Sequence, residues 1–202
     1  MKTLIAIPCL DMMHTEFVRC LVSLRIKGTA EISFGMSSLV YDTRNLFARK
    51  AVAGEFDRVL WLDSDMTFQP DLFTRLSEHL DNGRQFVTGL YVTRKKPIKP
   101  VIYKAFSAEE GKADCFEDYP KDSVFEIAGA GFGAVMVTTD LINRVGEKFG
   151  YPFSPIIGLG EDLSFCQRAR EVGATLYCDS SIKLGHVGYK EYTEASFLEG
   201  VT

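Results

Sequence analysis

The chain lacks the long apolar runs, paired cysteines and excess positive charge that mark several large classes of protein. None of its 202 residues falls in a stretch approaching the roughly 20 apolar residues of a membrane-spanning helix. Its 5 cysteines are odd in number and scattered, and the absence of a C-x-x-C pair argues against a zinc ribbon or a redox motif. The formal net charge is -4, so bulk nucleic-acid binding is not expected.

The N-terminus also lacks the pattern of a secretory signal. Its apolar run from Leu4 to Ile7 meets Pro8 and then Asp11, too early for such a signal. Together with the unpaired cysteines, this favours a cytoplasmic protein. The length and the ordinary composition predict a single domain over residues 1–202.

What the chain does have is an alternation of apolar strand-like runs with segments of helical periodicity, which is typical of an α/β fold. Strands are predicted at residues 3–8, 30–35, 58–62, 85–91, 101–106, 128–138 and 174–178. Helices are predicted at residues 15–26, 42–54, 70–80, 139–149 and 161–172. The acidic stretch 107–123 predicts a hairpin or flap, and the glycines of 129–133 predict a floor that lets a substrate approach closely.

Two carboxylates end the strand-like run 58–62, in the triplet Asp63-Ser64-Asp65. Ionised groups at the edge of an apolar core are costly unless they are paired, hydrogen-bonded or bound to a metal. Ligands of open α/β sheets bind at the carboxyl ends of strands, and Mg²⁺ and Mn²⁺ prefer carboxylate oxygens. The triplet therefore predicts a cation and phosphate site, with a local capping role for Asp63 as the alternative.

A second acidic pair, Glu161 and Asp162, opens a predicted helix after two glycines. Acidic residues in a first helical turn complement the helix dipole, and this explanation is about as strong as a catalytic one. Under the catalytic interpretation, a carboxylate fixed beside the glycine turn acts as a general base toward an acceptor hydroxyl.

Histidine and arginine supply the remaining candidates. His186 lies between two glycines after a strand-like segment, where metal binding and packing are about equally favoured. His79 lies in a predicted helix and His14 directly before one, without such a context, and both are assigned to packing or to the surface. Arg44 begins the second helix beside Asn45, and Arg94 opens a basic run, so these side chains are candidate anion or base contacts.

In chain order these motifs resemble those of the GT-A glycosyltransferases, and most of all the small family-2-like bacterial and phage nucleotide-sugar transferases. The resemblance spans nearly the whole chain. It depends on order and spacing more than on any one motif. Its elements are Pro8 after the first strand, Arg44-Asn45, Asp63-Ser64-Asp65, the segment Gly129 to Gly133, Gly160-Glu161-Asp162 and Gly185-His186.

The resemblance implies a Rossmann-like GT-A domain with a mixed, mostly parallel central sheet flanked by helices. Its nucleotide-binding half would span about residues 1–95 and its acceptor-binding half about 96–202. The implied activity is metal-dependent transfer of a hexosyl group from a nucleotide-diphosphate donor, a UDP-sugar above all, to a hydroxyl acceptor by an inverting route. The acceptor could be a glycan, a lipid-linked group or a protein, and self-association is left open.

The resemblance also implies a role for each matching residue. Mn²⁺ or Mg²⁺ would be held by Asp63, Asp65 and His186, with Asp65 as the more direct carboxylate. Asp162 would be the catalytic base, with Glu161 beside it in the acceptor pocket. The donor contacts would be Pro8, Asp42, Arg44, Asn45, Asp63, Ser64, Asp65, Arg94 and Lys190.

Two alternative functions remain open. A sugar nucleotidyltransferase also needs carboxylate-bound Mg²⁺, but that class resembles a first strand followed by a glycine-rich loop with Arg and Lys. Here the loop is Pro8-Cys9-Leu10-Asp11-Met12-Met13, which argues against it. A non-catalytic nucleotide-sugar-binding module is the other alternative.

Overall fold

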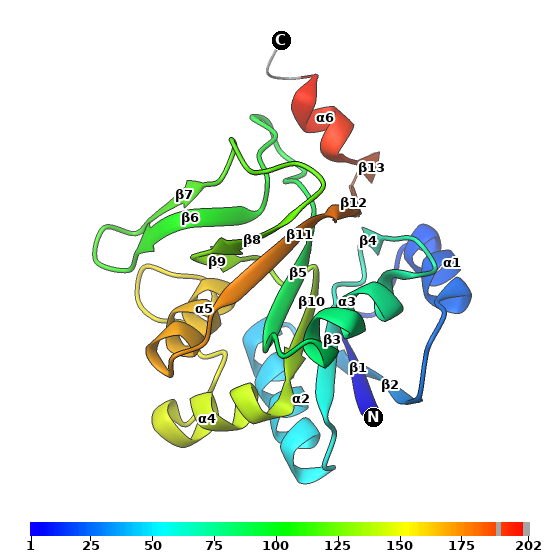
Figure 1. The fold of residues 1–202 in the computed structure, drawn as a ribbon, viewed down its shortest axis with the longest axis vertical. Helices are drawn as coiled ribbons and strands as arrows, with labels where there is room; N and C mark the ends of the chain where they lie inside the picture. The colour runs from blue at the N-terminus through cyan, green and yellow to red at the C-terminus, as the bar shows by residue number, and fades with distance from the viewer. Residues whose placement is uncertain (189–190, 200–202) are drawn as a thin grey trace.

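The computed structural model describes residues 1–188 and 191–199. Its centre is a seven-stranded sheet in the order β2-β1-β3-β10-β5-β11-β8 (Figure 1). Strands β1, β2, β3, β5 and β11 run in one direction, whereas β8 and β10 run antiparallel to their neighbours. The predicted mixed, mostly parallel α/β sheet is thus confirmed. The strands are β1 (Lys2–Cys9), β2 (Thr29–Met36), β3 (Arg58–Leu62), β5 (Phe86–Leu90), β8 (Val124–Ile127), β10 (Ala134–Thr138) and β11 (Leu176–Lys183).

Helices pack on both faces of this sheet and build one apolar core on each. Alternate side chains of β3 serve the two cores: Val59 and Trp61 contribute to the core beneath α2, α4 and α5, while Leu60 and Leu62 contribute to the core beneath α1 and α3. All four side chains are fully buried, as expected for a central strand covered on both faces. The helices are α1 (Thr15–Ser23), α2 (Val40–Ala53), α3 (Leu72–Asp81), α4 (Thr139–Phe149), α5 (Glu161–Glu171) and α6 (Glu194–Leu198).

Two small three-stranded sheets lie beside the main one. One has the order β13-β12-β4 and the other the order β7-β6-β9. β6 and β7 pair antiparallel, so residues 107–115 of the acidic stretch belong to a hairpin, whereas residues 116–123 form no strand. The strands are β4 (Met66–Thr67), β6 (Ile102–Ser107), β7 (Lys112–Cys115), β9 (Gly129–Ala130), β12 (Gly185–Val187) and β13 (Glu191–Tyr192).

The glycine-rich run predicted as one strand over 128–138 is divided between two sheets. β9 pairs with β6, whereas β10 lies between β3 and β5 in the main sheet. At the break, a Cβ on Gly131 would overlap the Tyr91 hydroxyl, and one on Gly133 would lie 2.9 Å from Met66 Sδ. These glycines make room for neighbouring side chains of the protein, which corrects the expectation of a floor for substrate.

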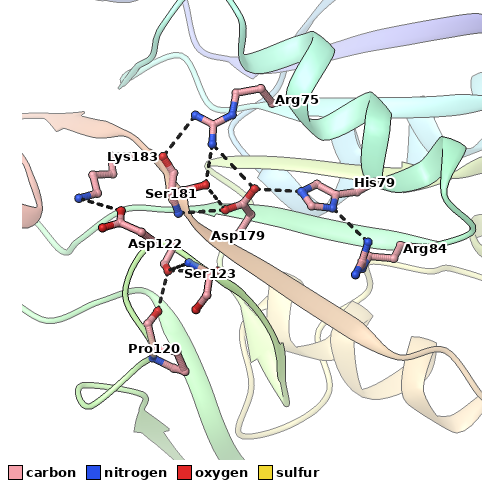
Figure 2. Close-up of polar contacts among 10 residues, drawn as sticks. Arg75, His79, Arg84, Pro120, Asp122, Ser123, Asp179, Ser181 and Lys183 are labelled. Carbon is pink, nitrogen blue, oxygen red and sulfur yellow. Dashed lines mark hydrogen bonds and ion pairs between the residues drawn. The ribbon is translucent and has the colours of Figure 1, made fainter.

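A polar network ties α3 to β11 (Figure 2). His79 Nε2 lies 3.0 Å from Asp179 Oδ2, and Arg75 donates to the Ser181 hydroxyl at 2.6 Å. Because Arg84 can only donate, its 3.3 Å contact to His79 Nδ1 makes that nitrogen the acceptor and leaves Nε2–H to serve Asp179. His79 is therefore a partner of a buried carboxylate, where the sequence suggested only packing or the surface.

Candidate functional site

A cavity of about 350 Å³ opens where β1 and β3 end. This is the edge at which open α/β sheets bind their ligands. The cavity lies between the loop after β1, the start of α2 and the triplet after β3. Six of the predicted site residues line it, namely Pro8, Arg44, Asp63, Ser64, Asp65 and Glu161.

Arg44, one of the lining residues, connects the two acidic segments. Its side chain is 2% exposed, and its Nη2 lies 2.8 Å from Asp63 Oδ1 while its Nε lies 3.4 Å from Glu161 Oε1. The guanidinium carbon also lies 5.8 and 5.3 Å from the ring centroids of Trp61 and Phe132. The remaining terminal nitrogen, Nη1, is buried and has no partner among the described residues. Burial raises the pKa of Asp63, and the charge of Arg44 opposes that rise.

Asp65 and His186 are brought together by the short ladder between β4 and β12. Val187 donates its backbone N–H to the Asp65 carbonyl at 2.7 Å, and His186 pairs with Met66. His186 Nε2 then lies 3.5 Å from Asp65 Oδ2, and its Nδ1 lies 2.8 Å from the Val92 carbonyl. Since a carbonyl can only accept, Nδ1 carries a proton, and in the neutral ring Nε2 presents its lone pair to the carboxylate.

Arg94 also contacts Asp65. Its Nη1 lies 2.8 Å from Asp65 Oδ2 and donates to the Val187 carbonyl at 3.0 Å. The other carboxylate oxygen, Oδ1, is buried without a hydrogen-bond partner in the described part of the chain. Burial by itself raises the pKa of Asp65, but the contact with His186, when its ring carries protons on both nitrogens, and the charge of Arg94 hold that pKa below its ordinary value.

Of the three cation ligands that the sequence predicted, the structure brings two together, Asp65 and His186. Among residues 1–188 and 191–199, no three His, Cys, Asp or Glu side chains are grouped so that they could hold a metal ion. Asp65 and His186 are adjacent, whereas Asp63 is turned toward Arg44. The unpartnered Asp65 Oδ1 and the oriented imidazole suit an ion that takes two protein ligands and completes its coordination with phosphate and water.

Asp162 lies in the first turn of α5, next to the cavity-lining Glu161. Its Oδ1 accepts a hydrogen bond from the Leu163 N–H at 2.7 Å. Burial, reinforced by the charge of Glu161, raises the pKa of Asp162 to about 6. After burial, the charge of Asp162 is the next cause that raises the pKa of Tyr103, so the two side chains are electrostatic neighbours. Asp162 itself is not among the residues that line the cavity.

Two predicted donor contacts, Asp42 and Asn45, do not line the cavity. Asp42 is exposed on α2 and does not line the cavity. Asn45 is buried, and its amide accepts from the Phe153 N–H at 2.9 Å and donates to the Ser154 hydroxyl at 3.4 Å, so it holds the segment that leads to α5. Lys190 lies outside the described residues.

Sequence reasoning missed the hydroxyl groups of this cavity. Ser37, Ser38 and Thr43 line it, from the segment between β2 and α2 and from the first turn of that helix. Their signal was a pair of small hydroxyl residues just before a predicted helix, a place where phosphates and other anions are often bound.

A larger hollow, of about 780 Å³, lies beside β4 and β12 and shares no lining residue with the first cavity. Its charged groups are Glu16, Lys183, Glu191 and Glu194. Lys183 Nζ is already paired with Glu194 at 2.7 Å. Asp63 and Asp65 line the smaller cavity and His186 contacts Asp65, so the smaller cavity is the candidate functional site.

Comparison with known proteins places the fold. No protein-family model and no curated protein matches the chain. Among solved structures, the protein A197 from STIV is similar, with a TM-score of 0.69 and 21% identity over 93% of this chain and 86% of that one. GalNAc-T7, solved with UDP, GalNAc and Mn²⁺, matches with a TM-score of 0.66 and 11% identity over 99% of this chain.

At these identities the likeness shows the fold alone, which is a GT-A-like fold as the sequence predicted. This chain spans 47% of the GalNAc-T7 chain, so it corresponds to about half of that protein. In the described part of the chain, no helix has both the length and the apolar character needed to cross a membrane.

Proposed function

We propose that this protein is a metal-dependent glycosyltransferase, organised as a single GT-A domain of the family-2-like type. It moves a sugar from a nucleoside-diphosphate donor, UDP-sugars first, to a hydroxyl acceptor. The observation that carries this proposal is the pairing of Asp65 with His186, whose ring is oriented by the Val92 carbonyl, at the carboxyl end of β3. The shared fold with an enzyme solved with UDP, GalNAc and Mn²⁺ supports it.

The charge of the cavity explains why a cation would be needed. Three carboxylates line it, those of Asp63, Asp65 and Glu161, against the guanidinium of Arg44 in the lining and that of Arg94, which contacts Asp65. A donor diphosphate would be repelled by this excess of negative charge. Mn²⁺ or Mg²⁺, held by Asp65 and His186, would supply positive charge that stabilises the diphosphate leaving group.

Asp162 is the proposed general base. It takes the proton of the acceptor hydroxyl while the acceptor oxygen forms its bond to the anomeric carbon of the sugar. The bond from that carbon to the diphosphate oxygen breaks on the opposite face, which gives an inverted product. A pKa of about 6 leaves the carboxylate ionised at neutral pH yet more basic than an exposed aspartate, as a general base requires.

Arg44 and its neighbours would position the donor. Arg44 lines the cavity, and its buried Nη1, which has no partner among the described residues, is the group that we assign to a ribose or base oxygen. Pro8 and Ser64 border the same space. Glu161 is held by Arg44, so its role in this scheme is to keep the first turn of α5 in place beside Asp162.

The decisive experiment is a panel of nucleotide sugars incubated with the protein and Mn²⁺ without acceptor. Slow release of the nucleoside diphosphate is the expected result. In a parallel incubation with a nucleoside triphosphate and a sugar phosphate, release of pyrophosphate would instead identify a nucleotidyltransferase. Binding without any turnover would identify a nucleotide-sugar-binding module. Asp162→Asn should retain donor binding and lose transfer to an acceptor.

A further inference from the structure

The two carboxylates of the triplet after β3, Asp63 and Asp65, are each paired with one arginine, and the two ion pairs have the same length. Arg44 Nη2 lies 2.8 Å from Asp63 Oδ1, and Arg94 Nη1 lies 2.8 Å from Asp65 Oδ2. The two arginines differ in exposure, because the Arg44 side chain is 2% exposed and the Arg94 side chain is 42% exposed. The two ion pairs therefore differ in how easily they can be broken.

Arg44 is fixed in its position. It has a second carboxylate partner in Glu161, and it lies near the rings of Trp61 and Phe132. Breaking these pairs would leave a buried guanidinium without its counter-charge, which is strongly unfavourable.

Arg94 is free to exchange. It lies on the loop after β5, and its other contact is to the backbone carbonyl of Val187. A guanidinium exposed to this extent regains hydration when it leaves its partner, so an ion pair of this kind contributes little and is readily replaced.

The contact made by Arg94 falls on the oxygen that faces His186. Asp65 Oδ2 lies 2.8 Å from Arg94 and 3.5 Å from His186 Nε2, and in the neutral ring that nitrogen presents a lone pair. A divalent cation bound between Asp65 and His186 would compete with the guanidinium for the charge of this carboxylate. The two cations are therefore alternatives at Asp65.

We propose that Arg94 is an exchangeable counter-ion: it neutralises Asp65 when no metal ion is bound, and a divalent cation displaces its guanidinium, which then pairs with the donor diphosphate. This inference rests on the cation site of the proposed function. It assigns Arg94 two opposing effects, since the residue opposes binding of the metal alone and favours binding of the nucleotide once the metal is present.

The test compares wild type with Arg94→Gln, Arg94→Lys and Lys95→Gln. Binding of Mn²⁺ alone is followed by the loss of the free-ion electron paramagnetic resonance signal, and binding of UDP at saturating Mn²⁺ by calorimetry. Arg94→Gln should bind Mn²⁺ about threefold to fivefold more tightly than wild type, as expected when a partly exposed competing ion pair is removed. The same variant should bind UDP about tenfold more weakly, because it lacks a charged hydrogen bond to phosphate.

The two controls separate contact from overall charge. Lys95→Gln removes an exposed positive charge from the same loop without a contact to Asp65, and its Mn²⁺ affinity should stay within about twofold of wild type. Arg94→Lys keeps the charge and should resemble wild type in Mn²⁺ binding. Circular dichroism and thermal melting verify that each variant is folded.

Two results would overturn the proposal in different ways. If wild type binds Mn²⁺ and Arg94→Gln binds it no more tightly, the counter-ion role is wrong while the cation site stands. If neither protein binds Mn²⁺, the cation site itself is wrong, and the proposed metal-dependent function fails together with the role of Arg94.

Discussion

Arg44 and Asp63 form an ion pair of 2.8 Å in which the arginine is almost fully buried and the aspartate is 32% exposed. The charge of Asp63 is thereby balanced within the protein. The neighbouring Asp65 is the carboxylate with a buried oxygen that has no partner in the described residues. We therefore expect the two aspartates of one triplet to have different roles, Asp63 in stability and Asp65 in the proposed binding of a cation.

Asp63→Asn should therefore destabilise the fold more than Asp65→Asn. Removing the charge of Asp63 leaves Arg44 with only its longer contact to Glu161, and we expect a loss of about 2–3 kcal/mol in the free energy of unfolding. Asp65→Asn leaves a half-exposed Arg94 and should cost less than about 1 kcal/mol. Urea unfolding without metal measures both values, and equal losses would contradict this division of roles.

Metal and nucleotide binding should show the opposite ranking. Asp65→Asn should weaken Mn²⁺ binding at least about tenfold, since the metal loses an anionic ligand. His186→Gln should also weaken it, and Asp63→Asn should weaken it less than either. Calorimetry with Mn²⁺, and then with UDP in the presence of Mn²⁺, gives the ranking. UDP binding that needs no metal would argue against the cation site.

The raised pKa of Asp162 predicts the pH dependence of transfer. Only the ionised carboxylate can accept a proton, so kcat/KM should rise with pH and level off above an apparent pKa near 6. The acidic limb of this kcat/KM profile should report an ionisation of the free protein and should not change with the donor. A profile that stays flat between pH 5 and pH 8 would remove Asp162 as the base.

The same carboxylate should cost stability at neutral pH. Its pKa is higher in the folded chain than the ordinary 3.8, so the folded state binds the extra proton and stability falls as pH rises from about 4 to about 6. Above pH 6, Asp162→Asn should raise the free energy of unfolding by up to about 3 kcal/mol, from a shift of about two pKa units. Melting curves at pH 7.5 and pH 4 test this, and the gain should disappear at pH 4.

Gly131→Ala should be destabilising because its Cβ would overlap the Tyr91 hydroxyl and lie 2.7 Å from Val101 Cγ1. We expect a loss of about 1–3 kcal/mol, typical of overpacking in a core. Tyr91→Phe removes the hydroxyl and should recover part of that loss in the double variant. A double-mutant cycle from urea melts measures the coupling, and strict additivity would mean that the two side chains do not compete for space.

Asp179 should contribute to stability only above acidic pH. Burial raises its pKa, but hydrogen bonds from His79 and Ser181 overcome that effect and lower it to about 2, below its ordinary 3.8. Its contribution is therefore complete above pH 4 and is lost as pH falls toward 2. Asp179→Asn should lower the free energy of unfolding by about 2 kcal/mol at pH 6. The difference from wild type should shrink between pH 4 and pH 2.

Elements with strong local signals could be predicted from the sequence. The strand Arg58–Leu62 and the helix Thr139–Phe149 have the predicted bounds, because an unbroken apolar run and a helical apolar stripe specify them locally. β11 is longer than predicted, since its end contains Asp179 and Ser180, polar residues that are buried because partners from other segments satisfy them.

The contacts that define the candidate site could not be predicted in the same way. The presence of carboxylates after β3 followed from the sequence, but the choice between Asp63 and Asp65 depends on Arg44 and Arg94, which approach from α2 and from the loop after β5. The orientation of His186 by the Val92 carbonyl likewise joins distant segments. Such pairings are decided by tertiary packing, on which local propensity has no bearing.

The ladder between β4 and β12 has a consequence for the order of folding. It joins Asp65 to His186 across more than half of the chain, and we expect contacts between such distant segments to form late because a long loop must close first. The segments around β1 and β3, which border the candidate site, can assemble earlier, from contacts that are closer in sequence. Tight Mn²⁺ binding would then mark the fully folded chain, and Mn²⁺ would stabilise that state over partly folded ones.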